Sequence, residues 1–454
     1  MISINSVSIN LNENEIKQAN KDWIFYFYLS SMLILLFLRN AIGVNIPVVF
    51  LLLLTIIPSF FGTKDHIVAT AVCCIPMSTG FQYKYALFIC ISAIVIRYRS
   101  QIRLSQVAYP VFFMMFWELL HGFTGQFSIL EYFRSFAELI FLVTVLSIDL
   151  KNINSKFIFR VLAVSTIGIC FIMLYLQLQQ FGFDFYSVFG RGFRTFRFGQ
   201  SNTTAENYGL NFNPNRLGSI CNLTIGSILL LLGRKEQSAL DLVLLALSVI
   251  FGFMTLSRTF VVGLVFILLY FILTAKGTIR QKILITISTI SITIIPIWLM
   301  NEYMPSILHN LIARFQEDNI LNNRDDLFLF YNKHILSSIP FFFFGIGLQD
   351  FQGKISSIHN VSINVAHNGF QEIWVVWGIV GVVLFIWMLV ALIRETKKYE
   401  PHPEIRQFLP LGLLFINSMA GQLIRSEIAI LSLVIVIVSL CSNNILAQTI
   451  NENI

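Results

Sequence analysis

Apolar runs long enough to cross a bilayer recur along the whole chain, and they constrain its fold more than any other feature. Hydrophobic residues make up 56% of the sequence and charged residues only 12%, which excludes a soluble globular protein of this length. A helix needs about 20 apolar residues to span the hydrocarbon core, and every backbone group there must be satisfied within the protein. The runs lack the period-2 alternation of a membrane barrel. The sequence therefore predicts an all-α polytopic membrane protein, with residues 1–454 as a single integral membrane domain.

The apolar runs predict about 14 transmembrane helices, within a range of about 12 to 14. The expected segments are 22–38, 41–61, 66–82, 84–96, 105–121, 131–149, 158–180, 216–233, 238–255, 259–275, 283–300, 369–393, 408–424 and 427–447. The third and fourth of these are short. The first 21 residues are polar and lack the pattern of a cleaved signal peptide.

The orientation follows from the Lys and Arg residues of the short loops, because cytoplasmic loops carry an excess of positive charge. If the N-terminus is cytoplasmic, five basic clusters all fall on the cytoplasmic side. They are Arg97, Arg99 and Arg103; Lys151, Lys156 and Arg160; Arg234 and Lys235; Lys276, Arg280 and Lys282; and Arg394, Lys397, Lys398 and Arg406. Both termini are therefore expected in the cytoplasm. Most of the net charge of +7 is explained by these loops, which set the orientation in the membrane, so no nucleic-acid partner is expected.

Two long loops on the predicted external side carry positive charge against this rule. The first spans 181–215, and the second, a large loop before the twelfth helix, spans 301–368. Within the second loop, apolar residues recur at helical spacing and predict an amphipathic helix on the membrane surface. These residues are Ile307, Leu308, Leu311, Ile312 and Phe315.

Arg258 is predicted at the external end of the ninth segment, between Ser257 and Thr259. A cation in or near a membrane is costly and usually marks a site with an anionic partner. The planar guanidinium matches phosphate oxygens, and the neighbouring hydroxyls add donors. The alternative is an arginine that reaches the interface and serves only as an anchor.

The first long loop contains further candidate anion ligands. Arg191, Arg194 and Arg197 alternate with aromatic residues in FGRGFRTFRFGQ, and they either bind an anionic head group or contact ordinary phospholipid. Arg216 opens the eighth helix after Asn213-Pro214-Asn215, where a proline suits a helix start. Its alternative role is that of an interfacial anchor.

His367-Asn368 lies where the second long loop enters the twelfth helix, and Glu372 follows about one turn later. Histidine can transfer protons near neutrality, and a helix N-terminus offers free N–H groups to an anion. A structural role for this histidine is the alternative. Asp325 and Asp326 beside Arg324 are too few for a convincing metal site and favour a salt bridge or solvation. The chain contains no P-loop, HExxH or GxSxG motif, so neither a nucleotide nor a metal is expected.

In their order and predicted sidedness, these motifs resemble those of the O-antigen polymerase and O-antigen ligase superfamily of bacterial polysaccharide assembly. The resemblance covers the architecture of the whole chain. Its motifs are NPNRLG at 213–218, LSRTFVVGL at 256–264, a large loop with Arg324 and a Gly345-Ile346-Gly347 turn, and AHNGFQEIWVVWGIVG at 366–381.

The resemblance implies roles for several residues. Arg258 and Arg324 would hold the diphosphate of an undecaprenyl-pyrophosphate-linked glycan, and His367 would be the catalytic base. Residues that would contact the substrate are Arg191, Arg194, Arg197, Arg216, Asn215, Ser257, Asn368 and Glu372. The loop before the eighth helix matches the family less well, so the roles of its arginines stay open.

The resemblance also implies an activity and a location. The expected function is a metal-independent, cofactor-free glycosyltransferase that moves a growing lipid-linked glycan onto the next lipid-linked repeat unit, for O-antigen, lipopolysaccharide, capsule or exopolysaccharide. A ligase of the same fold is the first alternative, and a lipid-linked oligosaccharide flippase is an alternative of another class. Expected partners are undecaprenyl-pyrophosphate-linked repeat units, membrane lipids, and a flippase and chain-length regulator of the same pathway. The expected location is the bacterial inner membrane, with the active site facing the periplasm or exterior.

Overall fold

The regular structure in the computed structural model is helical throughout its described residues. These residues are 13–78, 83–122, 128–184, 188, 192–195, 213–232, 238–274, 287, 291, 294–295, 297–299, 301–303, 305–316, 324–362, 366–401 and 403–441. The first half contains α1 (Glu13–Phe37), η1 (Leu38–Ile42), α2 (Val48–Phe61), α3 (Lys64–Met77), α4 (Tyr83–Arg97), α5 (Ala108–Gly122), α6 (Ile129–Leu146), α7 (Ser155–Gln180) and η2 (Gly192–Thr195). The second half contains α10 (Pro214–Leu232), α11 (Ala239–Met254), α12 (Arg258–Leu273), α14 (Pro305–Gln316), α15 (Arg324–Leu336), α16 (Ile339–Phe344), α17 (Phe351–His359), α18 (Gly369–Thr396), η3 (Ile405–Phe408), α19 (Leu409–Ala420) and α20 (Glu427–Cys441).

Three of the described helical stretches are long and apolar enough to cross a membrane: Asp22–Ile42, Ser155–Gln179 and Gly369–Thr396. Shorter apolar helices accompany them, among them α2, α11, α12 and α20. The predicted class, a helical membrane protein, is thus confirmed. The expected segment at 283–300 lies mostly outside the described residues.

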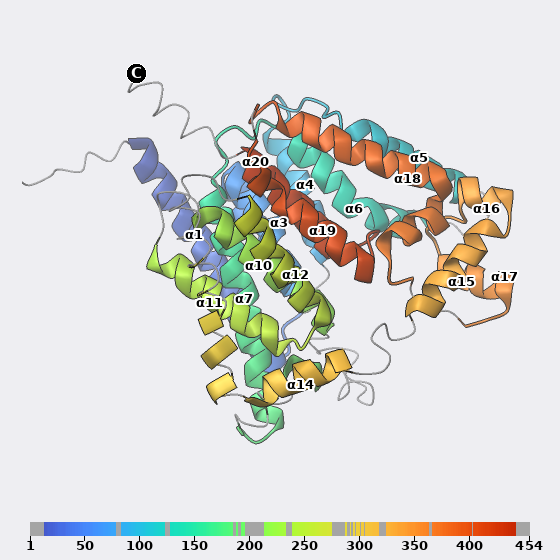
Figure 1. Cartoon of the computed structure of the whole chain (residues 1–454). Coiled ribbons are helices and arrows are strands. Elements are labelled where there is room, and N and C mark those ends of the chain that lie inside the picture. Colours follow the sequence, from blue (N-terminus) through green and yellow to red (C-terminus); the bar gives the residue numbers. More distant parts are fainter. Residues whose placement is uncertain are drawn as a thin grey trace, which may run out of the picture.

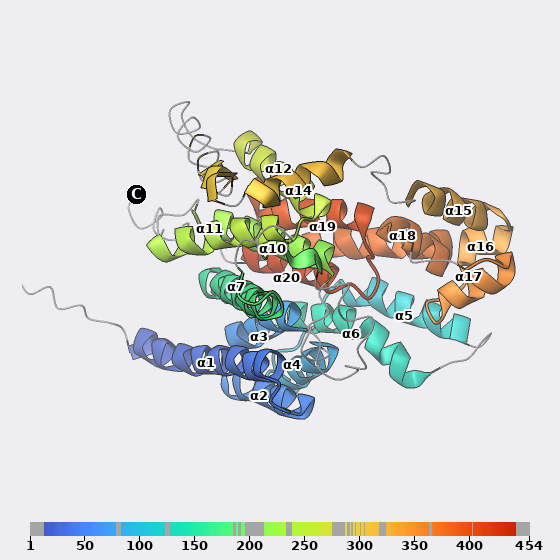
Figure 2. The ribbon, with the colours of Figure 1, turned by 90° about the horizontal axis from the view of Figure 1, so that it is seen from below.

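Helices α3 and α20 form the centre of the bundle. Every residue of α20 from Ile428 to Cys441 is buried, and so is every residue of α3 from Asp65 to Met77. Around α20 pack α19, α10, α6 and α3, while α3 also contacts α7 and α4 (Figures 1 and 2). All six cysteines are buried in the core, as their positions inside apolar runs predict.

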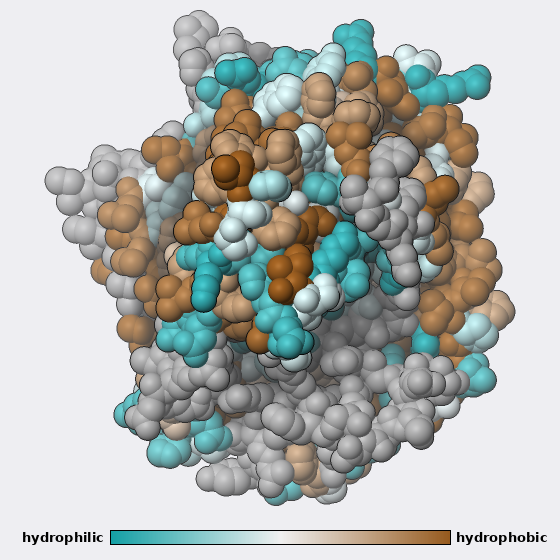
Figure 3. All heavy atoms as spheres, turned by 90° about the vertical axis from the view of Figure 1, so that its right-hand side faces the viewer, coloured by the Kyte–Doolittle hydropathy of each residue, from teal (hydrophilic) through white to brown (hydrophobic). Residues whose placement is uncertain are grey.

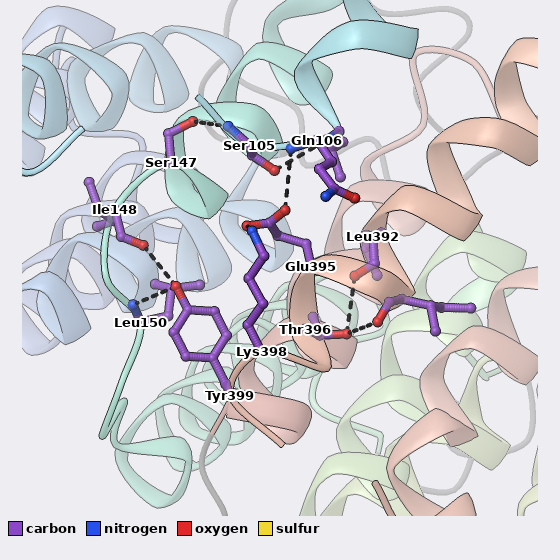
Figure 4. Close-up of polar contacts among 12 residues, drawn as sticks. Ser105, Gln106, Ser147, Ile148, Leu150, Leu392, Glu395, Thr396, Lys398 and Tyr399 are labelled. Atoms are coloured by element: carbon purple, nitrogen blue, oxygen red, sulfur yellow. Dashed lines mark hydrogen bonds and ion pairs between the residues drawn. The ribbon is translucent and has the colours of Figure 1, made fainter. Parts of the chain in front are cut away.

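Several loops that carry basic residues meet at one end of this bundle, which we call the basic end. Figure 4 shows the C-terminal end of α18 there, with Glu395 accepting a 3.3 Å hydrogen bond from the Gln106 backbone and pairing with Lys398 at 2.6 Å. The Tyr399 hydroxyl contacts the backbone of Ile148 and Leu150, each at 3.4 Å. The loops around residues 98–107 and 147–154 therefore lie beside the end of α18.

Helix α18 is interrupted in its interior at Gly378, whose φ of +65° is not helical. The break frees the carbonyls of Val375 and Val376, which accept hydrogen bonds from Ile346 (3.1 Å) and Gly347 (2.8 Å). The predicted turn at Gly345-Ile346-Gly347 thus docks on the broken helix. Irregular backbone of this kind is tolerated at membrane depth only where protein or a water-filled cavity satisfies it.

Helices α15, α16 and α17 lie beyond the end of α5 and of the first half of α18 (Figures 1 and 2). The face of the molecule on that side is hollowed near its centre, and hydrophilic residues gather beside the hollow (Figure 3). Helix α14 covers the expected amphipathic segment, and its Ile307 and Leu311 are buried while Ile312 is exposed. The range 301–368 is thus largely helical where it is described.

Candidate functional site

The NPNRLG and SRT motifs meet where α10 and α12 begin. The Ser257 hydroxyl donates a 2.9 Å hydrogen bond to Oδ1 of Asn215. Ser257 also caps α12, because its Oγ accepts the Phe260 N–H at 3.3 Å. The small Gly218 allows this approach, since a Cβ there would lie 3.1 Å from that of Ser257. The two motifs, about forty residues apart in sequence, thus form one structural unit; we call the end of the bundle that holds it the site end.

Arg258 is the first residue of α12 and is half-buried. Only residues 255–257 connect α11 with α12, and Leu256 in this connection has a φ of +49°. A non-glycine residue in the left-handed region is strained, and such strain often clusters at functional sites. The tight connection fixes the position of Arg258 at the start of α12.

Arg216, in the first turn of α10, is held by protein groups from two other helices. Its guanidinium pairs with Glu427 at the start of α20 and donates to the Ser78 hydroxyl at the end of α3. It also donates to the Ile75 carbonyl at 3.4 Å. One turn further along α10, Ser219 donates to Asn417 of α19 at 2.9 Å. These contacts join the site ends of α3, α10, α19 and α20.

The entry into α18 places His367, Asn368 and Glu372 within five residues of each other along the chain. Asn368 caps the helix, and its Oδ1 accepts the N–H groups of Phe370 and Gln371, both at 3.1 Å. His367 is half-buried, with a φ of +52°. The Gln371 amide donates to the Phe328 carbonyl at 2.7 Å and thereby ties α18 to α15.

Glu372, expected to bind substrate, is 2% exposed and serves the protein itself. Its Oε2 accepts the N–H of Leu423 at 2.9 Å and of Ile424 at 3.3 Å. Both donors belong to the connection between α19 and α20, residues 421–426, which we call the α19–α20 turn. Since Glu427 at the end of this turn pairs with Arg216, the turn links the α18 entry to the start of α10.

The arginines of the two long loops are described only in part. Arg194 lies in η2, but only its backbone is described. Arg191 and Arg197 lie outside the described residues. The backbone of η2 sits beside the α11–α12 connection, because the Gly192 carbonyl accepts from Gln177 at 2.6 Å and a Cβ on Gly192 would lie 2.5 Å from the Met254 carbonyl oxygen. Arg324 begins α15, and only its backbone is described.

Three charged residues with partners or positions in the bundle were not predicted from the sequence. Glu118 of α5 accepts both the Leu348 N–H, at 2.8 Å from Oε2, and the Trp377 indole N–H at 2.8 Å. Glu138 of α6 accepts from the Tyr83 hydroxyl at 2.5 Å and pairs with Lys84 at 3.1 Å. Arg425 lies in the α19–α20 turn. The signal was present, because ionisable residues within or between closely spaced apolar runs are costly and rarely incidental.

The described part of the chain holds no group of three or more His, Cys, Asp or Glu side chains arranged as a metal site. Asp325 and Asp326 are exposed in the first turn of α15, where negative charge interacts favourably with the helix dipole. Both carboxylates can thus stabilise the start of α15 without binding a metal.

A histidine pair lies farther out, in the helices beyond the α18 entry. Nδ1 of His334 in α15 and Nε2 of His359 in α17 are 2.7 Å apart. Burial of the His334 ring, with a smaller effect of the neighbouring His359, lowers the pKa of His334 to about 4. His334 is therefore neutral at physiological pH.

No protein-family model matches the chain, and no curated protein has significant sequence similarity to it. The function must therefore be argued from the site.

Proposed function

We propose that the protein is a polysaccharide polymerase that transfers a growing undecaprenyl-pyrophosphate-linked glycan onto a lipid-linked repeat unit. The hydrogen bond between Ser257 and Asn215 carries the proposal, because it couples the helix starts that present Arg258 and Arg216. Two cations at adjacent helix N-termini suit a diphosphate, since both the guanidinium groups and the helix dipoles favour negative charge.

The α18 entry supplies the second part of the proposed machinery. It is joined to the start of α10 through the α19–α20 turn, by way of Glu372 at one end and Glu427 at the other. His367 at this entry is the proposed base. The acceptor hydroxyl gives its proton to His367, its oxygen bonds to the anomeric carbon, and the bond from that carbon to the diphosphate breaks. The bonding electrons leave with the diphosphate, whose charge the arginines stabilise.

The chemistry needs no nucleotide, because the donor already carries a good leaving group. The protein has to orient the acceptor, exclude competing water and stabilise the departing charge. A single in-line displacement would invert the configuration at the anomeric carbon. Arg324, at the start of a helix tied to α18 through Gln371, is a further proposed ligand of the diphosphate.

The proposed location is the bacterial inner membrane, with about 14 transmembrane helices and both termini in the cytoplasm. Support comes from the way the loops sort between the two ends of the bundle. Loops near Arg103, Lys151 and Lys398 meet at the basic end, together with the C-terminal end of α18. The N-terminal end of α18 therefore lies away from the basic end, and Arg216 and Arg258 lie at the site end, where α10 and α12 begin. The site end then faces the periplasm or exterior, where lipid-linked repeats are polymerised.

The test is an assay of the purified full-length protein with its lipid-linked repeat unit, read out as product length. The wild-type protein is expected to form products that contain many repeat units. A ligase would instead stop after a single transfer to a different acceptor. Arg258→Ala and His367→Ala are expected to abolish these products. Lys398→Ala, which removes a cation paired with Glu395 at the basic end, is the control and should stay active. Long products from both site variants at wild-type levels would refute the proposal.

A further inference from the structure

Arg425 is an exposed arginine at the centre of the α19–α20 turn. Its φ is +56°, in the left-handed region that glycine adopts without strain and other residues adopt at a cost. Within the described part of the chain, its guanidinium has no hydrogen bond and no ion pair within 4 Å. The position thus holds a long cationic side chain where a glycine would be easier to accommodate.

The turn that carries Arg425 is fixed on both sides by residues of the proposed site. Before Arg425, the N–H groups of Leu423 and Ile424 bind the buried Glu372 carboxylate. After it, Glu427 pairs with Arg216. Gly369 permits the close packing, because a Cβ there would lie 2.5 Å from that of Leu423. Arg425 therefore lies between the α18 entry with His367 and the start of α10 with Arg216.

Carboxylates around the turn lie near Arg425 without binding it directly. Partial burial lowers the pKa of the Arg425 guanidinium, and the negative charges of Glu131, Glu118, Glu138 and Glu372 oppose this shift. Each has its own nearer partner: Arg134 for Glu131, Trp377 for Glu118, Tyr83 for Glu138 and the turn backbone for Glu372. The donors of Arg425 are left for a group that can approach from the exposed side.

We propose that Arg425 binds the diphosphate of the lipid-linked donor together with Arg216 and Arg258, and that Glu372 is the positioning residue that fixes the Arg425 turn. This inference rests on the proposed function. A diphosphate fits better than a monophosphate, because its two phosphate groups can engage the guanidinium group of Arg425 and those of Arg216 and Arg258 at once. The buried Glu372 acts through backbone N–H groups and does not touch the substrate.

The experiment measures binding of undecaprenyl pyrophosphate and of undecaprenyl phosphate to the full-length protein in detergent. Arg425→Gly is the main variant, because glycine suits a φ of +56° and removes the side chain without straining the turn. The variant is expected to bind the diphosphate about tenfold more weakly, the loss of one charge-assisted contact, and to lose part of its preference over the monophosphate. The affinity of Arg425→Lys should lie between those of wild type and Arg425→Gly. Lys398→Gln, which changes a cation paired with Glu395 at the basic end, should bind as wild type.

The outcomes separate this inference from the proposed function. If Arg425→Gly keeps the wild-type preference for the diphosphate while Arg258→Gln loses it, the inference is wrong and the proposed function stands. If wild type itself shows no preference for the diphosphate lipid, both are wrong. For Glu372, the Gln variant should reproduce the Arg425→Gly defect in part, because a neutral amide holds the two N–H groups less strongly. An unchanged affinity in Glu372→Gln refutes the positioning role.

Discussion

The Trp377 indole donates a 2.8 Å hydrogen bond to the Glu118 carboxylate, and both side chains are buried. The same carboxylate accepts the N–H of Leu348, just after the Gly345-Ile346-Gly347 turn. Glu118 of α5 therefore holds together the broken part of α18 and the segment that leads from α16 to α17. A carboxylate in an apolar helix is retained here as the acceptor for backbone and indole donors that water cannot reach.

Glu118→Leu is expected to destabilise the protein, because it leaves two buried donors without an acceptor. Each unsatisfied donor costs about 1 to 3 kcal/mol, so a total loss of roughly 2 to 6 kcal/mol is expected. Thermal unfolding in detergent measures it. Glu131→Leu is the control, because its ion pair with Arg134 lies at 45% side-chain exposure and should contribute at most about 1 kcal/mol. Equal unfolding temperatures for the two variants would contradict the assigned role of Glu118.

Gly378→Ala is expected to displace α16 from α18. An added Cβ would lie 2.2 Å from the Phe343 carbonyl oxygen, in addition to the strain of a φ of +65°. Gly43→Ala separates the two effects, because Gly43 has a φ of +81° with nothing within 4 Å of the added Cβ. The control should lose only about 1 kcal/mol from backbone strain. Proteolysis or hydrogen exchange in residues 339–359 should increase in Gly378→Ala alone, and equal effects of the two variants would argue against close packing at Gly378.

The packing of α15 on α17 is expected to weaken in acid. The 2.7 Å contact between His334 and His359 needs at least one neutral ring as acceptor. Burial lowers the pKa of His334 to about 4, whereas the ring in an unfolded segment takes up its proton near pH 6.5. The contribution of His334 to stability is therefore complete above about pH 6.5 and is lost as the pH falls from there toward 4.

Hydrogen exchange of residues 351–359 at pH 7.5 and pH 5, corrected for the intrinsic rate, measures this effect. Protection should fall at pH 5 in wild type and in His309→Gln, which changes an exposed histidine of α14. It should depend much less on pH in His334→Phe, because phenylalanine cannot take up a proton and still stacks on Phe341. Wild-type protection that is equal at both pH values would refute the prediction.

The helical membrane class and the approximate position of most helices could be predicted from the sequence, because bilayer thickness imposes a length on each apolar run. The contact between Asn215 and Ser257 was not predicted, since nothing in the spacing of the two motifs dictates that α10 and α12 start side by side. The role of Glu372 could not be foreseen. Its partners are backbone N–H groups of a turn about fifty residues away, and backbone groups carry no sequence signal.

The break in α18 shows a second limit of the sequence. The run AHNGFQEIWVVWGIVG contains three glycines, and nothing in the pattern distinguishes Gly378, with its positive φ, from Gly381, which stays helical. The distinction comes from tertiary contacts, because the carbonyls freed at Val375 and Val376 find donors in Ile346 and Gly347. A periodicity argument treats the whole run as one continuous helix.

Asn215 and Ser257 are expected to be energetically coupled, and the coupling should reach activity. Ser257→Ala removes both the cap of α12 and the donor to Asn215, and the loss of such a cap costs about 1 kcal/mol. Asn215→Ala removes only the acceptor. If the hydrogen bond positions Arg258 relative to Arg216, a double-mutant cycle on stability should show a coupling of about 0.5 to 1.5 kcal/mol. In the assay of the proposed polymerase activity, either single variant should then already give shorter products. Ser248→Ala is the matched control, because the bond of the Ser248 hydroxyl among the described residues goes to the Leu244 carbonyl within α11. A cycle that is additive within error, with normal product length in both single variants, would show that the two motifs touch without acting together.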